Sequence, residues 1–216
     1  MQVQSRYIPA LNRHWLTPGY DPLMRVLLPE TLLKQQLIAR ANIRSGQRVL
    51  DLGSGTGTLA LMLKAAVPES EVIGLDGDPQ IVTRARLKGR MAGLKVRFDE
   101  GLATALPYED AFFDTVVSSL VFHHLVSRDK ETAMKESWRV LRPGGMLMIL
   151  DLGPPRGAIA RLISLVFGHL EEVADNFHGR LPGMLRRAGF AEVTESGARL
   201  TVLGTMSFLA GTKPAG

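Results

Sequence analysis

Three closely spaced glycines, followed downstream by a carboxylate, are the residues whose types and spacing point most directly to chemistry. The stretch Val49-Leu-Asp-Leu-Gly-Ser-Gly-Thr-Gly57 places these glycines after an apolar run and before a helical pattern. Glycine lets a backbone approach a ligand without a Cβ in the way, and helix N-terminal N–H groups favour an anionic group. The next apolar run ends in Asp76, whose carboxylate can accept hydrogen bonds from two neighbouring ribose hydroxyls. The pattern predicts a ligand that contains a nucleoside.

The spacing of the glycines separates the classes of nucleoside cofactor. A dinucleotide-binding loop reads Gly-x-Gly-x-x-Gly. Here Gly57 comes one place too early after Gly53 and Gly55. The sequence also lacks the Tyr-x-x-x-Lys arrangement of one class of oxidoreductases. A nicotinamide dinucleotide is therefore disfavoured.

Histidines supply candidate general bases. His123 and His124 follow the fourth predicted strand, and His178 lies in a polar cluster at residues 175–180. A neutral imidazole near pH 7 suits proton abstraction from a phenol, a hydroxyl, an amine or an acidic carbon. We take His123 and His178 as candidate catalytic residues, with packing or loop capping as their alternative roles.

The elements that must position these residues follow an alternating pattern. Between Val49 and Leu150, short apolar or β-branched runs alternate with segments of helical period, as in a parallel α/β sheet. Such a sheet presents its loops and ligands at the carboxyl ends of its strands. The predicted strands are residues 47–52, 72–76, 94–98, 114–119 and 146–150, and the predicted helices are 58–66, 80–91 and 130–141.

The flanking segments complete one domain. Residues 20–41 are amphipathic and predict one or two helices interrupted at Pro29. An apolar helix at 158–167, a polar segment at 171–180, a short helix at 184–188 and strands at 191–195 and 200–209 follow. We therefore divide the chain into an N-terminal helical cover (1–42), a cofactor-binding core (43–152), a substrate-side insert (153–182), and a terminal helix with a strand pair (183–216).

Composition restricts the classes of function. A chain of 216 residues with 45% hydrophobic and 22% charged residues predicts a single globular domain. Its formal charge of +5 leaves nucleic acid, anionic membranes and small anions open as partners. The absence of cysteine excludes disulfides, thiolate metal sites and cysteine nucleophiles, and no metal is expected. With no signal-peptide pattern and no apolar run of membrane-span length, we expect a cytoplasmic protein.

The stretch from Val49 to Gly57 resembles the first motif of the class I S-adenosylmethionine-dependent methyltransferases. Residues 72–76, 105–114 and 138–145 resemble further motifs of these enzymes. Within the superfamily the chain is most similar to the ubiquinone/menaquinone C-methyltransferase branch and its small-molecule relatives. This resemblance implies a Rossmann-like α/β sandwich, with a seven-stranded, mostly parallel sheet, an antiparallel last strand and helices on both faces.

The resemblance also implies S-adenosylmethionine as the cofactor. It carries a binding role onto Asp51, Gly53, Ser54, Gly55, Thr56, Gly57, Asp76, Gly77, Leu102, Ala103 and Ser119. One position departs from the family, which usually has Asp or Asn before the alanine at 103 to accept from the adenine amino group. Leu102 cannot accept that bond, so only its backbone N–H carries over, with its side chain packing on the purine. We expect weaker adenine selectivity, or selectivity supplied by Glu100 or Thr104.

The predicted function is methyl transfer to a small apolar or aromatic molecule, with residues 23–38 and 158–167 covering the acceptor. The basic charge suggests an RNA or protein methyltransferase as an alternative, although residues 118–121 lack an Asn/Asp-Pro-Pro-aromatic motif. A non-catalytic S-adenosylmethionine-binding module is a second alternative, and an NAD-dependent oxidoreductase is the weakest. The acceptor, the atom methylated, and the choice between monomer and homodimer stay open.

Overall fold

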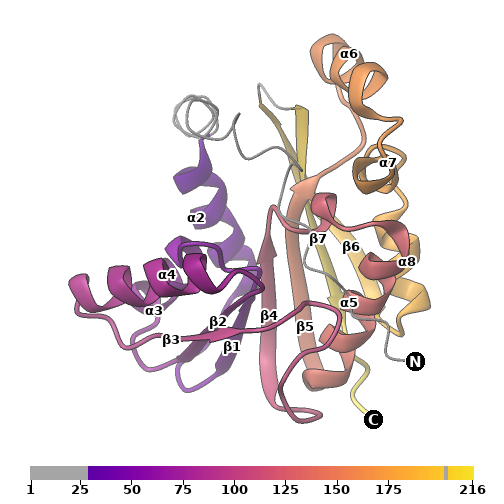
Figure 1. The fold of residues 1–216 in the computed structure, drawn as a ribbon. Helices are drawn as coiled ribbons and strands as arrows, with labels where there is room; N and C mark the ends of the chain where they lie inside the picture. The colour runs from indigo at the N-terminus through magenta and orange to yellow at the C-terminus, as the bar shows by residue number, and fades with distance from the viewer. Residues whose placement is uncertain (1–28, 202–203) are drawn as a thin grey trace, which may run out of the picture.

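A computed structural model describes residues 29–201 and 204–216, which form one seven-stranded sheet with helices on both faces (Figure 1). The strand order is β3-β2-β1-β4-β5-β7-β6. The strands are β1 (Arg48–Leu52), β2 (Glu71–Asp76), β3 (Arg97–Glu100), β4 (Phe113–Ser119), β5 (Leu141–Leu152), β6 (Ala191–Thr201) and β7 (Gly204–Thr212).

Strands β1 to β5 pair in parallel, whereas β7 is antiparallel to both β5 and β6. The predicted seven-stranded sheet with an antiparallel last strand is therefore confirmed. From β1 the chain runs outward to β2 and β3, and then returns to form β4 on the other side of β1. In open α/β sheets ligands bind where the strand order reverses in this way, so the crevice at the ends of β1 and β4 is the expected site.

One face of the sheet is covered by α2 (Glu30–Ala41), α3 (Thr58–Ala66) and α4 (Pro79–Met91). Leu33 and Leu37, one helical turn apart in α2, are fully buried with Val117 of β4 and Phe208 of β7. Apolar side chains at this spacing fix α2 across the middle of the sheet.

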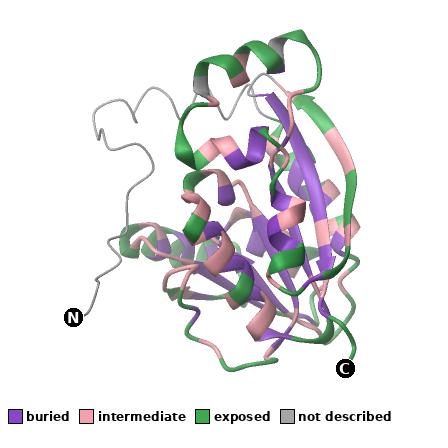
Figure 2. Cartoon of the chain, turned by 90° about the vertical axis from the view of Figure 1, so that its right-hand side faces the viewer, coloured by how far each residue is buried: buried purple, intermediate pink, exposed green. Residues whose placement is uncertain are grey.

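The other face is covered by α5 (Ser127–Val140) and α8 (Leu181–Arg187). Met134 and Leu185 from these helices pack on Leu50 and Leu147 of the sheet. The short helix η1 (Phe122–His124) and α7 (Glu171–Phe177) lie together at the carboxyl end of β5. Helix α6 (Ala158–Phe167) stands apart from both layers (Figure 1). Figure 2 shows the buried sheet between the mostly exposed outer surfaces of the helices.

Several predicted boundaries are wrong. Strand β3 begins at Arg97 rather than at residue 94. Strand β5 begins at Leu141 and so includes residues 142–145, which we predicted to form a turn. The Pro-Gly-Gly segment stays in the sheet as an irregular stretch, with Gly144 at φ of 77°, because the Gly144 N–H donates to the Lys213 carbonyl and the Lys213 N–H donates to the Gly145 carbonyl. A contact with the far end of the chain therefore overrides the local turn signal.

The C-terminal third also differs from the prediction. The polar segment at 171–180 contains the helix α7, and β6 continues through residues 196–199, where we expected a gap between strands. Pairing with β7 holds these residues in the sheet despite a register shift between Glu195 and Gly197. Most of the N-terminal cover predicted at residues 1–42 lies outside the described residues; α2 is its described part.

Candidate active site

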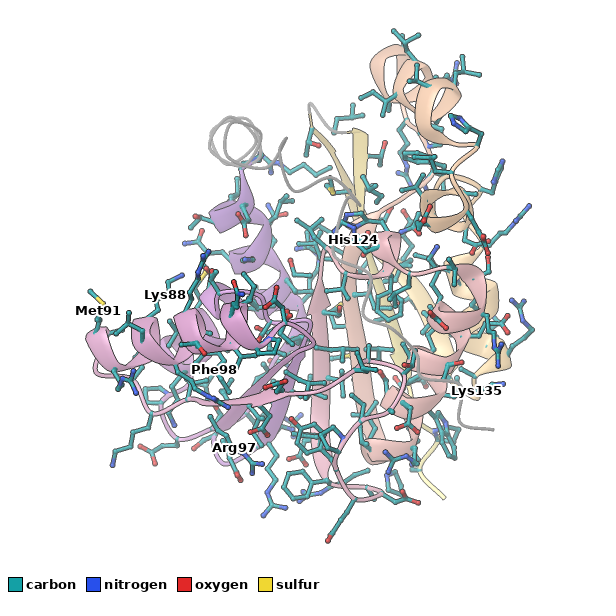
Figure 3. All side chains as sticks on the ribbon, viewed as in Figure 1. Lys88, Met91, Arg97, Phe98, His124 and Lys135 are labelled. Carbon is teal, nitrogen blue, oxygen red and sulfur yellow. The ribbon has the colours of Figure 1, made fainter. Side chains whose placement is uncertain are left out.

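The glycine-rich loop joins β1 to α3 at the expected edge of the sheet. Gly53, Gly55 and Gly57 all have positive φ, at 70°, 53° and 77°. A Cβ on Gly53 would lie 2.4 Å from a methyl group of Val121, and one on Gly57 would lie 2.5 Å from the ring of Phe98, which Figure 3 labels. A Cβ on Gly55 would meet nothing within 4 Å. Two glycines therefore serve protein packing, whereas Gly55 leaves backbone open to a ligand.

The carboxylate of Asp76 holds this loop in place. One oxygen accepts the Gly55 N–H at 2.8 Å, and the other accepts the Asp78 N–H at 3.0 Å. Each carboxylate oxygen can accept a second hydrogen bond, so Asp76 can still bind a pair of hydroxyls. Thr56 and Gly77, on either side of this contact, are half-buried.

Three buried polar atoms near the loop have no hydrogen-bond partner among the described residues: Asp51 Oδ2, Ser54 Oγ and Ser119 Oγ. Such atoms are rare because burial without a partner costs free energy. Burial raises the pKa of Asp51 to about 7, against the lowering effect of Lys34. A polar ligand with hydroxyl and cationic groups would satisfy these atoms. The predicted cofactor residues here therefore fit a nucleoside that carries a positive charge.

The predicted adenine side of the site lies next to Asp76. The Gly101 N–H donates to the Asp76 carbonyl at 3.0 Å, and the Ala105 N–H donates to the Leu102 carbonyl at 3.1 Å. Leu102 is half-buried, and Ala103 packs against the core beneath α5. The backbone thus brings Leu102 close to the end of β2, with an apolar side chain where the family usually places an acceptor.

A histidine–aspartate pair lies across the crevice. His123 Nδ1 is 2.8 Å from Asp151 Oδ1, and the Asp151 side chain is 1% exposed. Burial raises the pKa of Asp151, but the charge and hydrogen bond of His123, with backbone N–H groups, outweigh this and lower it. An ionised Asp151 fixes the proton on Nδ1 and leaves Nε2 as the acceptor. The pair can therefore take a proton from a bound molecule.

Asp151 also shapes the backbone that carries His123. Its second oxygen accepts the N–H groups of Val121 and Phe122, at 3.0 and 2.8 Å. The turn into η1 passes through Leu120, a non-glycine residue with φ of 60°. Strain of this kind costs about 1–3 kcal/mol and persists where surrounding contacts hold it. Since Val121 also packs on Gly53, the histidine segment and the glycine loop are in contact.

The other histidines are placed differently. The ring of His124 contacts that of His123 at a tilt of 44°, with ring centroids 3.9 Å apart, and lies near the carboxyl ends of the central strands (Figure 3). Although its side chain reaches solvent, desolvation and the neighbouring imidazole lower its pKa to about 4. His178 is exposed at the C-terminal end of α7, and within the described residues no hydrogen bond joins its ring to Asp151. The structure thus brings His123, but not His178, to the buried carboxylate.

Asn176 of α7 completes the polar side of the crevice. Its side-chain amide donates to Asp151 Oδ1 at 3.2 Å and to the Leu152 carbonyl at 3.1 Å, while its Oδ1 is buried without a described partner. Two residues of the α5–α7 contact hold this helix: Lys130 donates to the Glu172 carbonyl, and Ser127 donates to Asp175. The insert therefore reaches the site through Asn176.

Sequence reasoning missed Asp151 as a site residue and did not single out Asn176. The signal for Asp151 was present, because it directly follows an apolar run just as Asp76 does at the end of β2. Asn176 lies in the polar cluster that the sequence indicates at residues 175–180, but its contact with Asp151 could not be predicted, since it depends on how α7 folds back onto β5. In the part of the chain described by the structure, no three His, Asp or Glu residues are grouped as they would be around a metal ion.

The sheet is doubly wound, and the ends of its strands carry a glycine-rich loop, a carboxylate that can accept from ribose hydroxyls, and an Asp–His pair. These features define a class of enzymes that have a Rossmann-like topology and bind a nucleoside cofactor. Residues 49–145 match a methyltransferase domain family. The chain is 39% identical over 158 residues to a demethylmenaquinone methyltransferase of Deinococcus radiodurans, covering 72% of this chain and 65% of that protein. It is also 39% identical over 155 residues to the enzyme of that name from Thermus thermophilus, covering 70% of each chain.

A ubiquinone/menaquinone biosynthesis C-methyltransferase from Pectobacterium carotovorum is 33% identical over 191 residues, covering 86% of this chain and 70% of that protein. The chain belongs to the class I S-adenosylmethionine-dependent methyltransferases, in the ubiquinone/menaquinone C-methyltransferase branch.

Crystal structures share the fold at 20% identity: the Bacillus subtilis YcgJ protein (TM-score 0.70, covering 86% of this chain and all of that one) and the [4+2]-cyclase SpnF (TM-score 0.70, covering 86% and 82%). The cyclase shows that this fold also supports other reactions.

Proposed function

We propose that this protein transfers a methyl group from S-adenosylmethionine to a ring carbon of a small quinone-type acceptor in its reduced, hydroquinone form. The observation that carries the proposal is the His123–Asp151 pair in contact with the glycine loop. Support for the acceptor class comes from the names of the relatives.

The residues of the loop fit the cofactor. The open backbone at Gly55 and the carboxylate of Asp76 would hold the ribose side, and Leu102 would lie against the base. The buried carboxylate of Asp51, with Ser54 and Ser119 nearby in the sheet, would meet the cationic end. When bound, S-adenosylmethionine supplies an electrophilic methyl group on a sulfonium.

The task left to the protein is to make the acceptor carbon nucleophilic. An oxidised quinone ring is electron-poor, whereas a hydroquinone that loses a hydroxyl proton places electron density on the neighbouring ring carbon. Nε2 of His123 accepts that proton, and Asp151 stabilises the resulting imidazolium through Nδ1–H. Methylation leaves the ring as its keto tautomer. The proton of the methylated carbon then passes to solvent, and the imidazolium of His123 returns its proton to the ring oxygen, which restores the aromatic hydroquinone and the neutral base.

The test separates cofactor binding from catalysis. Calorimetry with S-adenosylhomocysteine and with NAD is expected to show binding of the first alone. Labelled S-adenosylmethionine is then incubated with a water-soluble 1,4-naphthohydroquinone that lacks a substituent at carbon 2, and with the same compound oxidised. We expect a methylated product from the reduced form. Binding without transfer to any hydroquinone would contradict the proposed activity, and transfer to RNA would favour the alternative class.

A further inference from the structure

Helix α6 exposes an apolar face to solvent. Leu162, Leu165 and Val166 are 63%, 79% and 52% exposed, and Leu170 just beyond the helix is 42% exposed. On its inner side the helix is anchored by the buried Ala160, and it contacts β7 and α7. In Figure 2 it lies at one extremity of the molecule, apart from the buried core. Large apolar side chains grouped in this way mark an interaction surface.

The charge on α6 itself is basic. Arg161 is exposed on the helix and His169 follows it, whereas the acidic residues nearest in the chain, Glu171 and Glu172, belong to the first turn of α7, and Arg156 before the helix is paired with Glu195 of β6. The patch continues onto β6 through Leu200, which is 62% exposed and whose methyl groups lie 3.9 Å from where a Cβ on Gly157 would be. A helix with an apolar face, one exposed arginine and no acidic residue of its own has the composition of a helix lying in the interface of an anionic membrane.

The position of α6 connects this face to the site. Helix α6 packs on α7, and α7 carries Asn176, which donates to Asp151 of the histidine pair. In Figure 1, α6 stands beyond the end of the sheet to which the arrow of β5 points. A surface that lies on α6 would therefore face the end of the molecule at which the site opens.

We propose that α6 and Leu200 dock the protein onto the surface of a bilayer that contains anionic lipid. Leu162, Leu165 and Val166 would enter the acyl boundary, and Arg161 would meet the headgroups. The contact is superficial, since no helix in the described part of the chain is long and apolar enough to cross a bilayer. The inference rests on the proposed function in one respect: a lipid-dissolved quinone-type acceptor would be reached from that surface.

The test is flotation of the full chain with vesicles of phosphatidylcholine, with and without phosphatidylglycerol. We compare the wild type with the double variant Leu162→Glu/Leu165→Glu. The matched control is Leu87→Glu/Met91→Glu, which alters two equally exposed apolar residues of α4, 51% and 80% exposed. We expect binding to anionic vesicles to fall about tenfold or more in the α6 variant and to stay unchanged in the control.

The outcomes separate docking from catalysis because flotation needs no acceptor. Both double variants should bind S-adenosylhomocysteine with wild-type affinity in calorimetry, because neither pair of residues belongs to the glycine loop. Absence of wild-type binding to anionic vesicles, or equal loss in both variants, would overturn the docking proposal. So would a change of oligomeric state confined to the α6 variant without vesicle binding, because the face would then be a contact between copies. Vesicle binding without methyl transfer would refute the proposed function and leave docking intact.

Discussion

Replacing each of the adjacent histidines separately provides a sharp test of the active site. His123 and His124 are neighbours in the chain and their rings are in contact, but only His123 has a ring nitrogen within hydrogen-bonding distance of the buried Asp151 carboxylate. We expect His123→Ala to abolish most of the methyl transfer and His124→Ala to retain it. The comparison controls for local packing, since both substitutions remove an imidazole from the same short helix.

The expected loss follows from the role of the pair. General-base catalysis contributes about 10²–10⁴-fold, so His123→Ala should lower kcat by about that factor, or about 3–5 kcal/mol in the activation barrier. Asp151 keeps the N–H groups of Val121, Phe122, Leu152 and Asn176 in that variant. The remaining partners should hold the fold, with a stability loss of about 1–3 kcal/mol. His124→Ala should change kcat by less than about threefold, since it removes a largely exposed side chain.

The assay is single-turnover methyl transfer to a soluble hydroquinone across a range of pH. The affinity of each variant for S-adenosylhomocysteine, measured by calorimetry, should match the wild type because the glycine loop is unchanged. The rate of the His123 variant should recover with acceptors whose hydroxyl is already ionised. Equal losses in the two variants, or a loss in cofactor affinity that accounts for the rate, would refute the assignment of His123 as the base.

The acid stability of the same variant gives an independent readout. Because the pKa of Asp151 is lowered in the fold, its ionised form stabilises the protein above the unfolded-state pKa near 3.8, and this contribution is lost as the pH falls through the folded-state value. Removing His123 removes a main cause of the lowering. Acid unfolding, followed by circular dichroism, should therefore begin at a higher pH in His123→Ala than in the wild type or in His124→Ala.

Three further predictions concern the cofactor side. Burial raises the pKa of Asp51 to about 7, so ionising this group in the fold costs stability as the pH rises from about 4 to 7. At pH 8 the free energy of unfolding of Asp51→Asn should therefore exceed that of the wild type by up to about 4 kcal/mol, and the variant should bind S-adenosylhomocysteine more weakly. A stability difference between variant and wild type that is the same at pH 5 and pH 8 would contradict this. Gly53→Ala should destabilise by more than about 2 kcal/mol and abolish binding, because its Cβ would meet Val121, whereas Gly46→Ala, with φ of 78° and open space, should cost about 1 kcal/mol with binding unchanged in calorimetry. Leu102→Asp should tighten binding of S-adenosylhomocysteine relative to its inosine analogue, and no change in that ratio would remove the account of adenine selectivity.

The sequence is sufficient to predict the parts of the site that depend on local signals. The glycine loop, Asp76 and the strand before each of them follow from short-range spacing and from the apolar period of buried strands. The antiparallel last strand follows from the family resemblance. Boundaries fail where long-range pairing overrides a local signal, as at residues 142–145, which contact Lys213 from the end of the chain.

Of the Asp151–His123 pair, only the histidine could be predicted from the sequence. His123 could be proposed from its residue type and from its place after a strand, but its partner depends on the register of β4 with β5, which places Ser119 beside Leu150 and Asp151 one residue further on. Asn176 depends in addition on the buried contact of Lys130 with the chain at Glu172 and Asp175. Such contacts join residues about 40 positions apart, and no local pattern encodes them.

The position of β7 between β5 and β6 has a consequence for how the protein is made. Synthesis reaches β7 after every other described element, yet β7 is an interior strand. Until it inserts, β5 presents a long open edge of N–H and C=O groups, and β6 has no strand partner among the described residues. The sheet that carries Asp151 therefore closes only when β7 inserts between β5 and β6, and a form in which β7 is detached would be the one most prone to pair with another chain.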